Sequence, residues 1–331
     1  MFNISKLKEL SFLVYGLGLS GQSVVKFFKK NNIKNYKIWD DKQKKIFKNN
    51  KSKDLTETLN NVDYIVLSPG VSLIDKKKLV KFKKKIITDI DLIYLTNKNF
   101  KSIVVTGTNG KSTTCKLINH LLKKNKYKVL LGGNIGTPIL DLKIKKNTYV
   151  IIEASSFQLS HSKFIHPDFA FLLNISNDHL DWHGNMINYR NSKLKIFSLQ
   201  KKNQFALIDI KLKKIFKRKK FLSKLIIPSE KKYQKIKLKI KNNYLRSNIN
   251  DKNMSFVYKF SKLININEKN FIKTMESFIG LPHRYEIFLK RKNIIFINDS
   301  KATSFESAKY ALMNTKNVYW ILGGLPKKSD K

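Results

Sequence analysis

The chain has 331 residues, of which 42% are hydrophobic and 11% aromatic, so it can bury sizeable cores and disorder over most of its length is excluded. One cysteine, Cys115, excludes a disulfide framework and a multi-cysteine metal site. The formal charge of +44 comes almost entirely from lysines dispersed along the whole chain, and arginine, the usual reader of bases and phosphates, is scarce, so we expect no specific nucleic-acid partner.

Residues 1–97 predict a small α/β domain. Short apolar runs at 12–15, 36–39, 63–67 and 85–88 predict strands, and 22–30 predicts a helix. Strands that alternate with helices favour a parallel, doubly wound sheet. Gly16, Gly18 and Gly21 follow the first strand, and Asp40 closes the second. This spacing is typical of a loop that binds a nucleotide or its diphosphate, and because nothing marks a hydride-transfer site, a nucleotide-linked substrate is favoured over nicotinamide.

Residues 98–284 predict a second α/β domain. We expect strands at 102–105, 128–131, 149–152 and 169–173 and a helix at 114–124. The lysine-rich stretch 201–248 carries little recognisable chemistry, and we expect surface strands and connections there.

The strongest motif is a phosphate loop between the strand 102–105 and the helix that follows. Its residues are Gly107, Thr108, Asn109, Gly110, Lys111, Ser112 and Thr113. Glycines let backbone N–H groups close on phosphate oxygens, Lys111 can reach the β- and γ-phosphates, and the Ser112 hydroxyl can bind Mg²⁺. The spacing departs from the common form of the motif, because position 105 is Val where that form has Gly.

Polar residues follow other strands of this domain. Glu153 ends a strand, where a carboxylate can hold Mg²⁺ directly or through water. The segment 177–183 packs Asp178, His179, Asp181 and His183 together, and we expect at least one imidazole to be a site residue. Periodicity alone predicts that Lys193, on an amphipathic helix, faces solvent.

Residues 285–331 predict the start of a third α/β unit. We expect strands at 294–297 and 318–322, a polar turn at 299–303 and a helix at 304–313. A doubly wound domain usually needs on the order of 100 residues, so we expect that the chain is a fragment and this domain incomplete.

Taken together, these residues resemble the Mur ligase family of ATP-dependent amide ligases. The motifs are, in chain order, Gly107-Thr-Asn-Gly-Lys-Ser-Thr113, Gly132-Gly-Asn-Ile-Gly136, Glu153-Ala-Ser-Ser-Phe-Gln-Leu159, Asn174-x-x-x-Asp178-His179-Leu-Asp181, Tyr189-Arg190-x-x-Lys193 and Asn298-Asp-Ser-Lys-Ala-Thr303. The N-terminal Gly-Leu-Gly-Leu-Ser-Gly21 and the junction Phe278-Ile-Gly-Leu-Pro-His-Arg284 resemble most the branch that adds D-glutamate to UDP-N-acetylmuramoyl-L-alanine.

The resemblance implies an α/β fold in three parts and a reaction of peptidoglycan precursor synthesis. The parts are a Rossmann-like domain that binds the UDP substrate (1–97), a central P-loop ATPase-type domain (98–284) and the start of a third Rossmann-like domain that binds the amino acid (285–331). In the family, a carboxylate attacks the γ-phosphate of ATP to give an acyl phosphate and ADP, and an incoming amine then displaces phosphate.

The resemblance also implies roles for individual residues. Substrate contacts would be Leu19, Ser20, Asp40, Gly70, Asn134, His179, Thr303 and Lys327, the last with Lys328 as an alternative. ATP contacts would be the phosphate loop 107–113 with Asn250, Asn253, Arg284, Asp299 and Lys301. Catalytic residues would be Lys111, Glu153, His179 and Lys193, and Mg²⁺, in two sites, would be held by Ser112, Glu153, His179 and Lys193 if the last is carbamylated.

Two departures from the family pattern bear on these roles. The Gly-x-His that usually precedes the two asparagines is Ser247-x-Ile249 here, which weakens the adenine assignment. The third domain of the family continues past Gly324 and supplies further contacts to D-glutamate, so we expect this chain to bind the UDP substrate and not to complete ligation by itself.

Three alternatives stay open at this point. The chain could be a sister Mur ligase for another amino acid, a non-catalytic UDP-sugar-binding remnant, or a P-loop protein that binds nucleic acid through its positive charge. We expect a cytoplasmic protein with no membrane partner, because the N-terminus lacks a signal-peptide pattern and no apolar run reaches the roughly 18–20 residues of a membrane span. We also expect a monomer.

Overall fold

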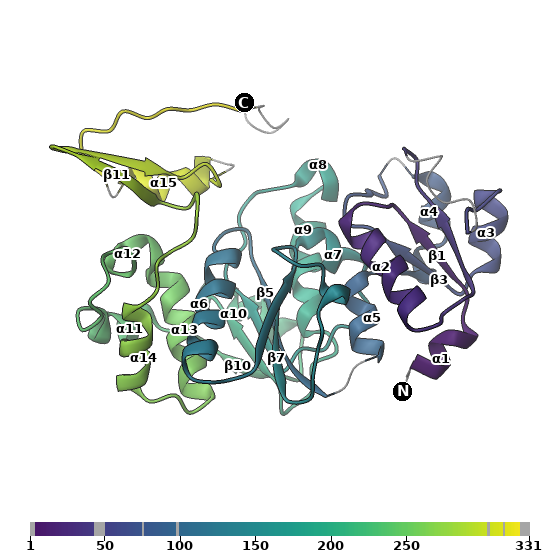
Figure 1. Ribbon diagram of the computed structural model, residues 1–331, viewed down its shortest axis with the longest axis horizontal. Coiled ribbons are helices and arrows are strands. Elements are labelled where there is room, and N and C mark those ends of the chain that lie inside the picture. The colour runs from purple at the N-terminus through teal and green to yellow at the C-terminus, as the bar shows by residue number, and fades with distance from the viewer. Residues whose placement is uncertain are drawn as a thin grey trace.

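The computed structural model describes residues 4–42, 50–74, 76–96, 99–302, 305–313 and 315–324. Within them the chain forms two parallel sheets followed by a two-stranded antiparallel hairpin. Figure 1 shows these parts in order, from the purple N-terminal sheet through the teal central sheet and green helices to the yellow hairpin. In the described residues, no helix is both long and apolar enough to cross a membrane.

The first sheet confirms the four strands predicted between residues 12 and 88. Its strands are β1 (Phe12–Tyr15), β2 (Tyr36–Trp39), β3 (Tyr64–Leu67) and β4 (Ile86–Ile87), all parallel in the order β2-β1-β3-β4. Its helices are α1 (Ile4–Glu9), α2 (Leu19–Lys30), α3 (Leu55–Asn61), α4 (Lys77–Lys81) and α5 (Asp89–Thr96). Helix α2 covers one face, where the rings of Phe12 and Phe28 lie 4.9 Å apart. Helices α3 and α4 cover the other face.

The central sheet has six parallel strands with the phosphate-loop strand in its interior. They are β5 (Phe100–Thr106), β6 (Val129–Gly133), β7 (Thr148–Glu153), β8 (Phe169–Leu172), β9 (Phe205–Ile208) and β10 (Lys224–Ile226), in the order β10-β9-β8-β5-β7-β6. The strands β5, β7 and β8 are buried along nearly their whole length, as expected for a parallel sheet with helices on both faces.

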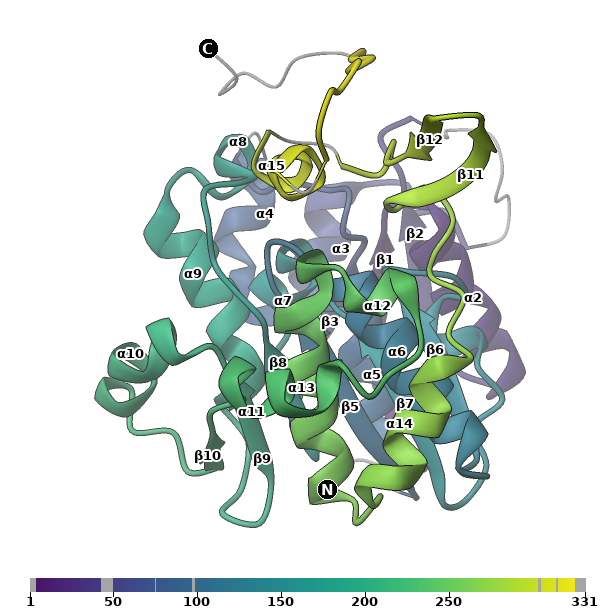
Figure 2. The ribbon, with the colours of Figure 1, turned by 90° about the vertical axis from the view of Figure 1, so that its left-hand side faces the viewer.

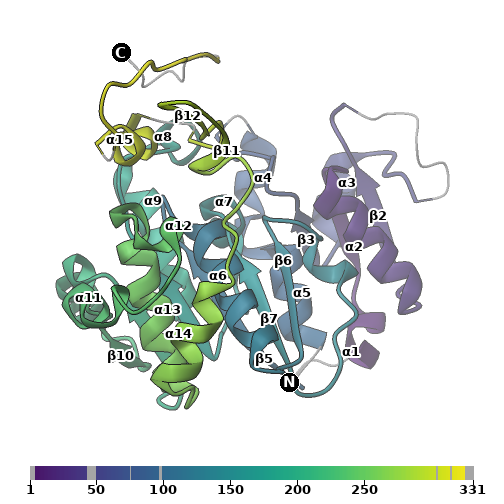
Figure 3. The same cartoon turned by 60° about the vertical axis from the view of Figure 1, so that its left-hand side comes forward.

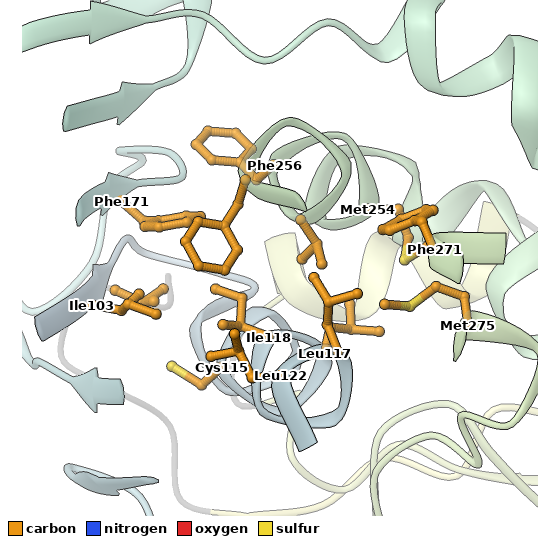
Figure 4. Packing of buried hydrophobic residues seen from close by; sticks show 14 of the residues in the cluster. Ile103, Cys115, Leu117, Ile118, Leu122, Phe171, Met254, Phe256, Phe271 and Met275 are labelled. Carbon is orange, nitrogen blue, oxygen red and sulfur yellow. The ribbon is translucent and has the colours of Figure 1, made fainter. Parts of the chain in front are cut away.

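Successive residues of each central strand contribute to different cores, because side chains alternate across a sheet. Ile103 and Val105 face a core formed with α6 (Lys111–Lys124), α13 (Asp251–Leu263) and α14 (Glu268–Glu276), whereas Val104 faces the opposite core. Figure 2 shows α13 and α14 on the side of the sheet toward the viewer. Figure 4 shows Leu117 of α6 next to Met275 in this core, with Phe171 of β8 on the other side of the cluster near Phe256.

Helix α5 is shared by the two sheets. Leu92 and Leu95 belong to the first core, and Ile90, Ile93 and Tyr94 belong to the central one. Figure 3 shows α5 between the central strands and the helices of the N-terminal sheet. The two sheets therefore pack through one common helix.

The expectation of surface strands throughout 201–248 is only partly right. Strand β9 is buried, and the segment also forms helices α10 (Lys213–Arg218), α11 (Glu230–Lys237) and α12 (Asn243–Arg246). Tyr233 and Ile236 of α11 anchor this segment in the core, at the i, i+3 spacing of a helix. The many lysines between such anchors obscure the helical period in the sequence.

The third part is an antiparallel hairpin and a helix. The hairpin pairs β11 (Glu286–Arg291) with β12 (Ile294–Asn298), and α15 (Phe305–Met313) follows. The predicted strand at 318–322 is wrong for this structure: the segment pairs with no described residue, and Tyr319 is 99% exposed. A strand requires a hydrogen-bonded neighbour, and apolar content alone does not supply one.

Candidate active site

The phosphate loop joins β5 to α6 at the carboxyl edge of the central sheet. Gly110 has φ +83°, a left-handed conformation that favours glycine, and α6 begins at the next residue, Lys111. A Cβ at Gly110 would lie 2.3 Å from Oδ1 of Asn253, so the loop backbone packs directly against that side chain. The structure thus brings Asn253 of α13 to the loop.

The end of β8 holds the loop in shape. The Asn109 N–H donates to Asn174 Oδ1 at 2.8 Å, and Asn174 Nδ2 donates to the Asn109 carbonyl at 3.0 Å. The hydroxyls of Thr108 and Tyr189 lie 3.0 Å apart. These contacts hold the loop against the end of β8 and against α9 (Met186–Leu194), and a loop held in this way is preorganised for phosphate binding.

Two lysines converge on the carbonyl of Gly107. Lys111 Nζ and Lys193 Nζ each donate to this oxygen at 2.9 Å. Lys193 is 1% exposed, and its amine lies 4.7 Å from the centre of the Tyr189 ring. Burial lowers the pKa of Lys193 well below its usual value, and the nearby charge of Lys111 lowers this pKa further. Burial also lowers the pKa of Lys111.

The prediction that Lys193 faces solvent is wrong. Helix α9 (Met186–Leu194) buries Tyr189, Ser192 and Lys193, which share one face at i, i+3 and i+4. This face lies against the phosphate loop, so the polar type of Lys193 was a poor guide to its orientation.

Glu153 lies at the end of β7, next to the loop strand. It is 2% exposed, and its Oε1 accepts from Asn134 Nδ2 at 2.9 Å. Its Oε2 is buried and has no hydrogen-bond partner among the residues that the structure describes. A buried carboxylate oxygen with an open lone pair is an unsatisfied group that a cation can satisfy.

The residues at this edge fit Mg²⁺ only together with phosphate. Within the described ranges, no group of three or more His, Cys, Asp and Glu side chains is arranged to hold a metal. Mg²⁺ usually binds through one or two carboxylates, substrate phosphates and water, so Glu153 Oε2 and the hydroxyl of Ser112 suit it.

Arg284 connects the third part of the chain to the loop. Its Nη2 donates to Ser112 Oγ at 3.3 Å. Asp299 accepts from the Tyr285 N–H at 3.0 Å; burial raises the pKa of Asp299, and Arg284 opposes that shift. Lys301 follows in the same turn, but its side chain is exposed. The structure therefore brings Arg284 to the loop, with Asp299 close to Arg284.

The two predicted imidazoles have different surroundings. His179 caps α8 (Leu180–His183) with φ +52°, lies 3.3 Å from an oxygen of Asp178 and stays partly exposed. His183 is buried, with Nε2 3.0 Å from the hydroxyl of Ser156. Burial lowers the pKa of His183 to about 4. His179 is thus the more exposed of the two imidazoles, and His183 is held by Ser156.

Asn250 is placed differently from Asn253. It is 2% exposed, and its Nδ2 donates to the carbonyl of Tyr244 at 3.0 Å. Asn253 Oδ1 accepts from the hydroxyl of Thr114 at 3.4 Å. Only Asn253 contacts the phosphate loop directly.

The predicted UDP contacts gather at the carboxyl edge of the first sheet. Asp40 accepts from the Leu17 N–H at 2.6 Å, which fixes the glycine loop after β1. A Cβ at Gly21 would lie 1.9 Å from the Gly16 carbonyl, so the close turn requires glycine there. Leu19 and Gly70 are exposed beside this loop.

Two predicted substrate contacts, Thr303 and Lys327, lie outside the described residues. Two other residues support the phosphate loop in the structure but were not predicted to do so. Asn174 and Tyr189, which hold the phosphate loop, were noted only as parts of motifs. A polar residue at a strand end, the signal that identified Glu153, could have identified Asn174 as well.

Comparisons with known proteins agree with these motifs. Residues 105–280 match the model of the Mur ligase middle domain. The UDP-N-acetylmuramoylalanine–D-glutamate ligase of Rickettsia felis is 37% identical over 344 residues, covering 95% of this chain and 76% of the relative. The enzyme of the same name from Buchnera aphidicola is 36% identical, covering 96% of this chain and 78% of the relative.

Solved structures show the same fold at low identity. A MurF ligase from Thermotoga maritima in complex with ADP has a TM-score of 0.53 and 17% identity, covering 95% of this chain and 73% of that one. The UDP-N-acetylmuramate–alanine ligase MurC from Thermotoga maritima has a TM-score of 0.53 and 16% identity, covering 92% and 77%. These structures support the predicted α/β fold class.

Proposed function

The chain belongs to the Mur ligase family, and we infer that it is the ligase that joins D-glutamate to UDP-N-acetylmuramoyl-L-alanine, forming ADP and phosphate. The reaction belongs to cytoplasmic synthesis of peptidoglycan precursors, with small-molecule substrates and a monomeric enzyme. The observation that carries the proposal is the convergence of Lys111 and Lys193 on the Gly107 carbonyl, beside the buried open oxygen of Glu153.

We assign the parts of the chain as the sequence predicted. Residues 1–97 bind the UDP-linked substrate through Leu19, Ser20, Asp40 and Gly70 at the first glycine loop. Residues 98–284 bind ATP, and 285–331 contribute to the nucleotide and amino-acid sites. The packing of α5 in both cores supports a fixed relation between the first two sites.

The chemistry follows from charge neutralisation and positioning. The substrate carboxylate attacks the γ-phosphorus of ATP; the new O–P bond gives an acyl phosphate, and the broken bond releases ADP. The amine of D-glutamate then forms the amide, phosphate leaves, and the amine proton passes to the medium. Lys111 exchanges its two loop-carbonyl bonds for phosphate oxygens, where its charge stabilises the transferring group.

Two groups would complete the site. Ser112 and Glu153, with His179 as the resemblance implies, would hold Mg²⁺, which would neutralise phosphate charge. Lys193 is proposed to carry CO₂ as a carbamate: an N–C bond forms and a proton is lost, which turns the side chain into an anion. Its lowered pKa supports this, because the neutral amine is the nucleophile. Isotopically labelled bicarbonate should give a carbamate signal in carbon NMR that Lys193→Met abolishes.

A binding panel tests the proposed substrate. We expect UDP-N-acetylmuramoyl-L-alanine to bind more tightly than UDP-N-acetylmuramate or the UDP-muramoyl dipeptide, and ATP to bind with Mg²⁺. Preference for another precursor would identify a sister ligase, and UDP-substrate binding without any ATP binding would identify a remnant. With ATP present, hydroxylamine should trap the acyl phosphate as a hydroxamate only when the preferred UDP substrate is added.

A further inference from the structure

The first turn of α13 carries three consecutive side chains that reach three different parts of the central domain. Asp251 forms an ion pair with Lys237 of α11, and Lys252 forms one with Asp209, directly after β9. Asn253 packs against the phosphate loop. Figure 2 shows α11 beside α13. The position of Asn253 at the loop therefore depends on how this turn is held.

The ion pair of Lys237 and Asp251 is buried. Lys237 is 5% exposed and Asp251 is 7% exposed, and Nζ of Lys237 lies 2.6 Å from Oδ1 of Asp251. Lys237 Nζ also donates to Asn248 Oδ1 at 2.8 Å. Gln234 Nε2, from the same helix α11, donates to Asp251 Oδ2 at 2.6 Å. Buried charges are costly unless they are paired and hydrogen-bonded, so this network favours one arrangement of α11 against the start of α13.

The network lies where the chain departs from the pattern of the family. Asn248 is the middle residue of Ser247-Asn-Ile249, the segment that replaces the usual Gly-x-His before the two asparagines. Lys237 binds Asn248, which precedes Asn250, and Asp251, which follows it. One lysine of α11 thus holds the segment that leads into α13 at two points.

Asn253 has little freedom to move at the loop. A Cβ at Gly110 would lie 2.3 Å from its Oδ1, and the same oxygen accepts from the Thr114 hydroxyl at 3.4 Å. Asp251 and Asn253 belong to the same helical turn, so a shift of Asp251 also moves Asn253. A shift away from the loop would lengthen a hydrogen bond that is already long, and the contact would be lost.

We propose that Lys237 and Asp251 are positioning residues that hold Asn253 at the phosphate loop and thereby contribute to the affinity for ATP. This rests on the proposed function, in which the loop binds ATP and Asn253 contacts the nucleotide. Without Lys237, Asp251 keeps only the exposed Gln234 as its partner on α11, and the first turn of α13 is held less closely. The UDP site of the first sheet is untouched by this change.

Two control variants separate this role from general effects of charge and stability. Lys239 forms a surface ion pair at 3.2 Å with Glu268, at the start of α14, so Lys239→Met removes the same charge from a neighbouring position. Phe260 lies near the other end of α13 and packs fully buried against the ring of Phe169, so Phe260→Leu weakens the core contacts of the same helix. Both variants should bind ATP within about twofold of the wild type.

The experiment measures dissociation constants by calorimetry for ATP with Mg²⁺ and for UDP. The proteins are the wild type, Lys237→Met, Asn253→Ala, the variant with both changes and the two controls. We expect Lys237→Met to bind ATP roughly tenfold more weakly and UDP within about twofold of the wild type. The variant with both changes should bind ATP within about twofold of Asn253→Ala alone, because Lys237 acts through Asn253. A purely structural role of Lys237 would instead weaken the binding of both ligands, or add its loss to that of Asn253→Ala.

The outcomes separate the two proposals. If the wild type binds no ATP in the presence of Mg²⁺, the proposed function fails, and the positioning role fails with it. If the wild type binds ATP but folded Lys237→Met retains that affinity, or Lys239→Met loses it equally, or the losses from Lys237→Met and Asn253→Ala add, only the positioning role fails. Should Lys237→Met not fold, the variant with both Lys237→Met and Asp251→Leu leaves no unpaired buried charge. Wild-type affinity for ATP in that variant would equally overturn the role of the pair.

Discussion

Replacement of Gly110 by alanine tests whether the phosphate loop requires both a left-handed backbone and an open surface against Asn253. The new Cβ would lie 2.3 Å from Asn253 Oδ1, so this oxygen must retreat by about 1 Å to reach ordinary van der Waals contact. That movement breaks its hydrogen bond with the Thr114 hydroxyl, which is 3.4 Å long. Gly110→Ala therefore perturbs the side chain that we assign to the nucleotide as well as the loop.

The expected magnitude has two parts. A non-glycine residue in the left-handed region costs about 1–2 kcal/mol. The lost Thr114–Asn253 hydrogen bond adds about 0.5–1.5 kcal/mol. Gly184 provides a control for a positive φ without a close contact, because it has φ +78° and ψ −39° and open space where a Cβ would lie. Gly184→Ala should show a backbone cost alone, whereas Gly110→Ala should be destabilised by about 1.5–3.5 kcal/mol, since both parts apply to it.

Urea denaturation measures the stability difference, and titration with ATP and Mg²⁺ measures affinity. We expect Gly184→Ala to bind ATP like the wild type and Gly110→Ala to bind roughly tenfold or more weakly, because the methyl group narrows the approach to the loop N–H groups. If Gly110→Ala bound ATP within twofold of the wild type and matched Gly184→Ala in stability, the contact with Asn253 would be irrelevant to both properties. The assignment of the loop as the ATP site would then fail.

Three further predictions concern buried ionisable groups. Without bicarbonate, Lys193→Met should be more stable than the wild type at pH 7, as measured by urea denaturation. The native pKa of Lys193 is lowered, so below pH 10.5 the unfolded chain binds a proton that the native site does not. The difference in stability between the two proteins should therefore narrow toward pH 10. A Lys193→Met chain less stable at every pH would contradict this. Glu153→Gln keeps an acceptor for Asn134 but loses the negative charge. Titration should therefore show roughly tenfold weaker binding of ATP with Mg²⁺ and unchanged binding of metal-free ADP. Equal losses of affinity for both nucleotides would exclude a metal-binding role for Glu153. The pKa of His183 is lowered to about 4, so the stability of the wild type should fall by roughly 1 kcal/mol per pH unit as the pH falls from 6.5 toward 4. His183→Gln should show a shallower fall. Parallel pH profiles for the two proteins would refute this role of His183.

The sequence predicted those strands whose apolar residues are followed directly by a glycine or a polar residue of the candidate sites. The four N-terminal strands, the loop strand and the strand that ends at Glu153 were confirmed, because apolar runs bounded by glycine or an acid are distinctive in parallel sheets. The helices within 201–248 were missed, because lysine occupies nearly every exposed position and hides their period. The strand expected at 318–322 failed for a different reason: pairing depends on a neighbour, which composition cannot report.

For the site, the sequence pointed to the groups that we propose carry the chemistry more readily than to those that hold them in place. Lys111 and Glu153 stood out as candidates because few residue types can bind phosphate or Mg²⁺ at a strand end. Their supports did not, because they join distant positions: Asn109 to Asn174 across 65 residues and Thr108 to Tyr189 across 81. Each support is an ordinary amide or hydroxyl whose type suits many surface positions equally well. Only the packing of the strands and helices brings these groups to their partners, so positioning residues become visible when the fold is known.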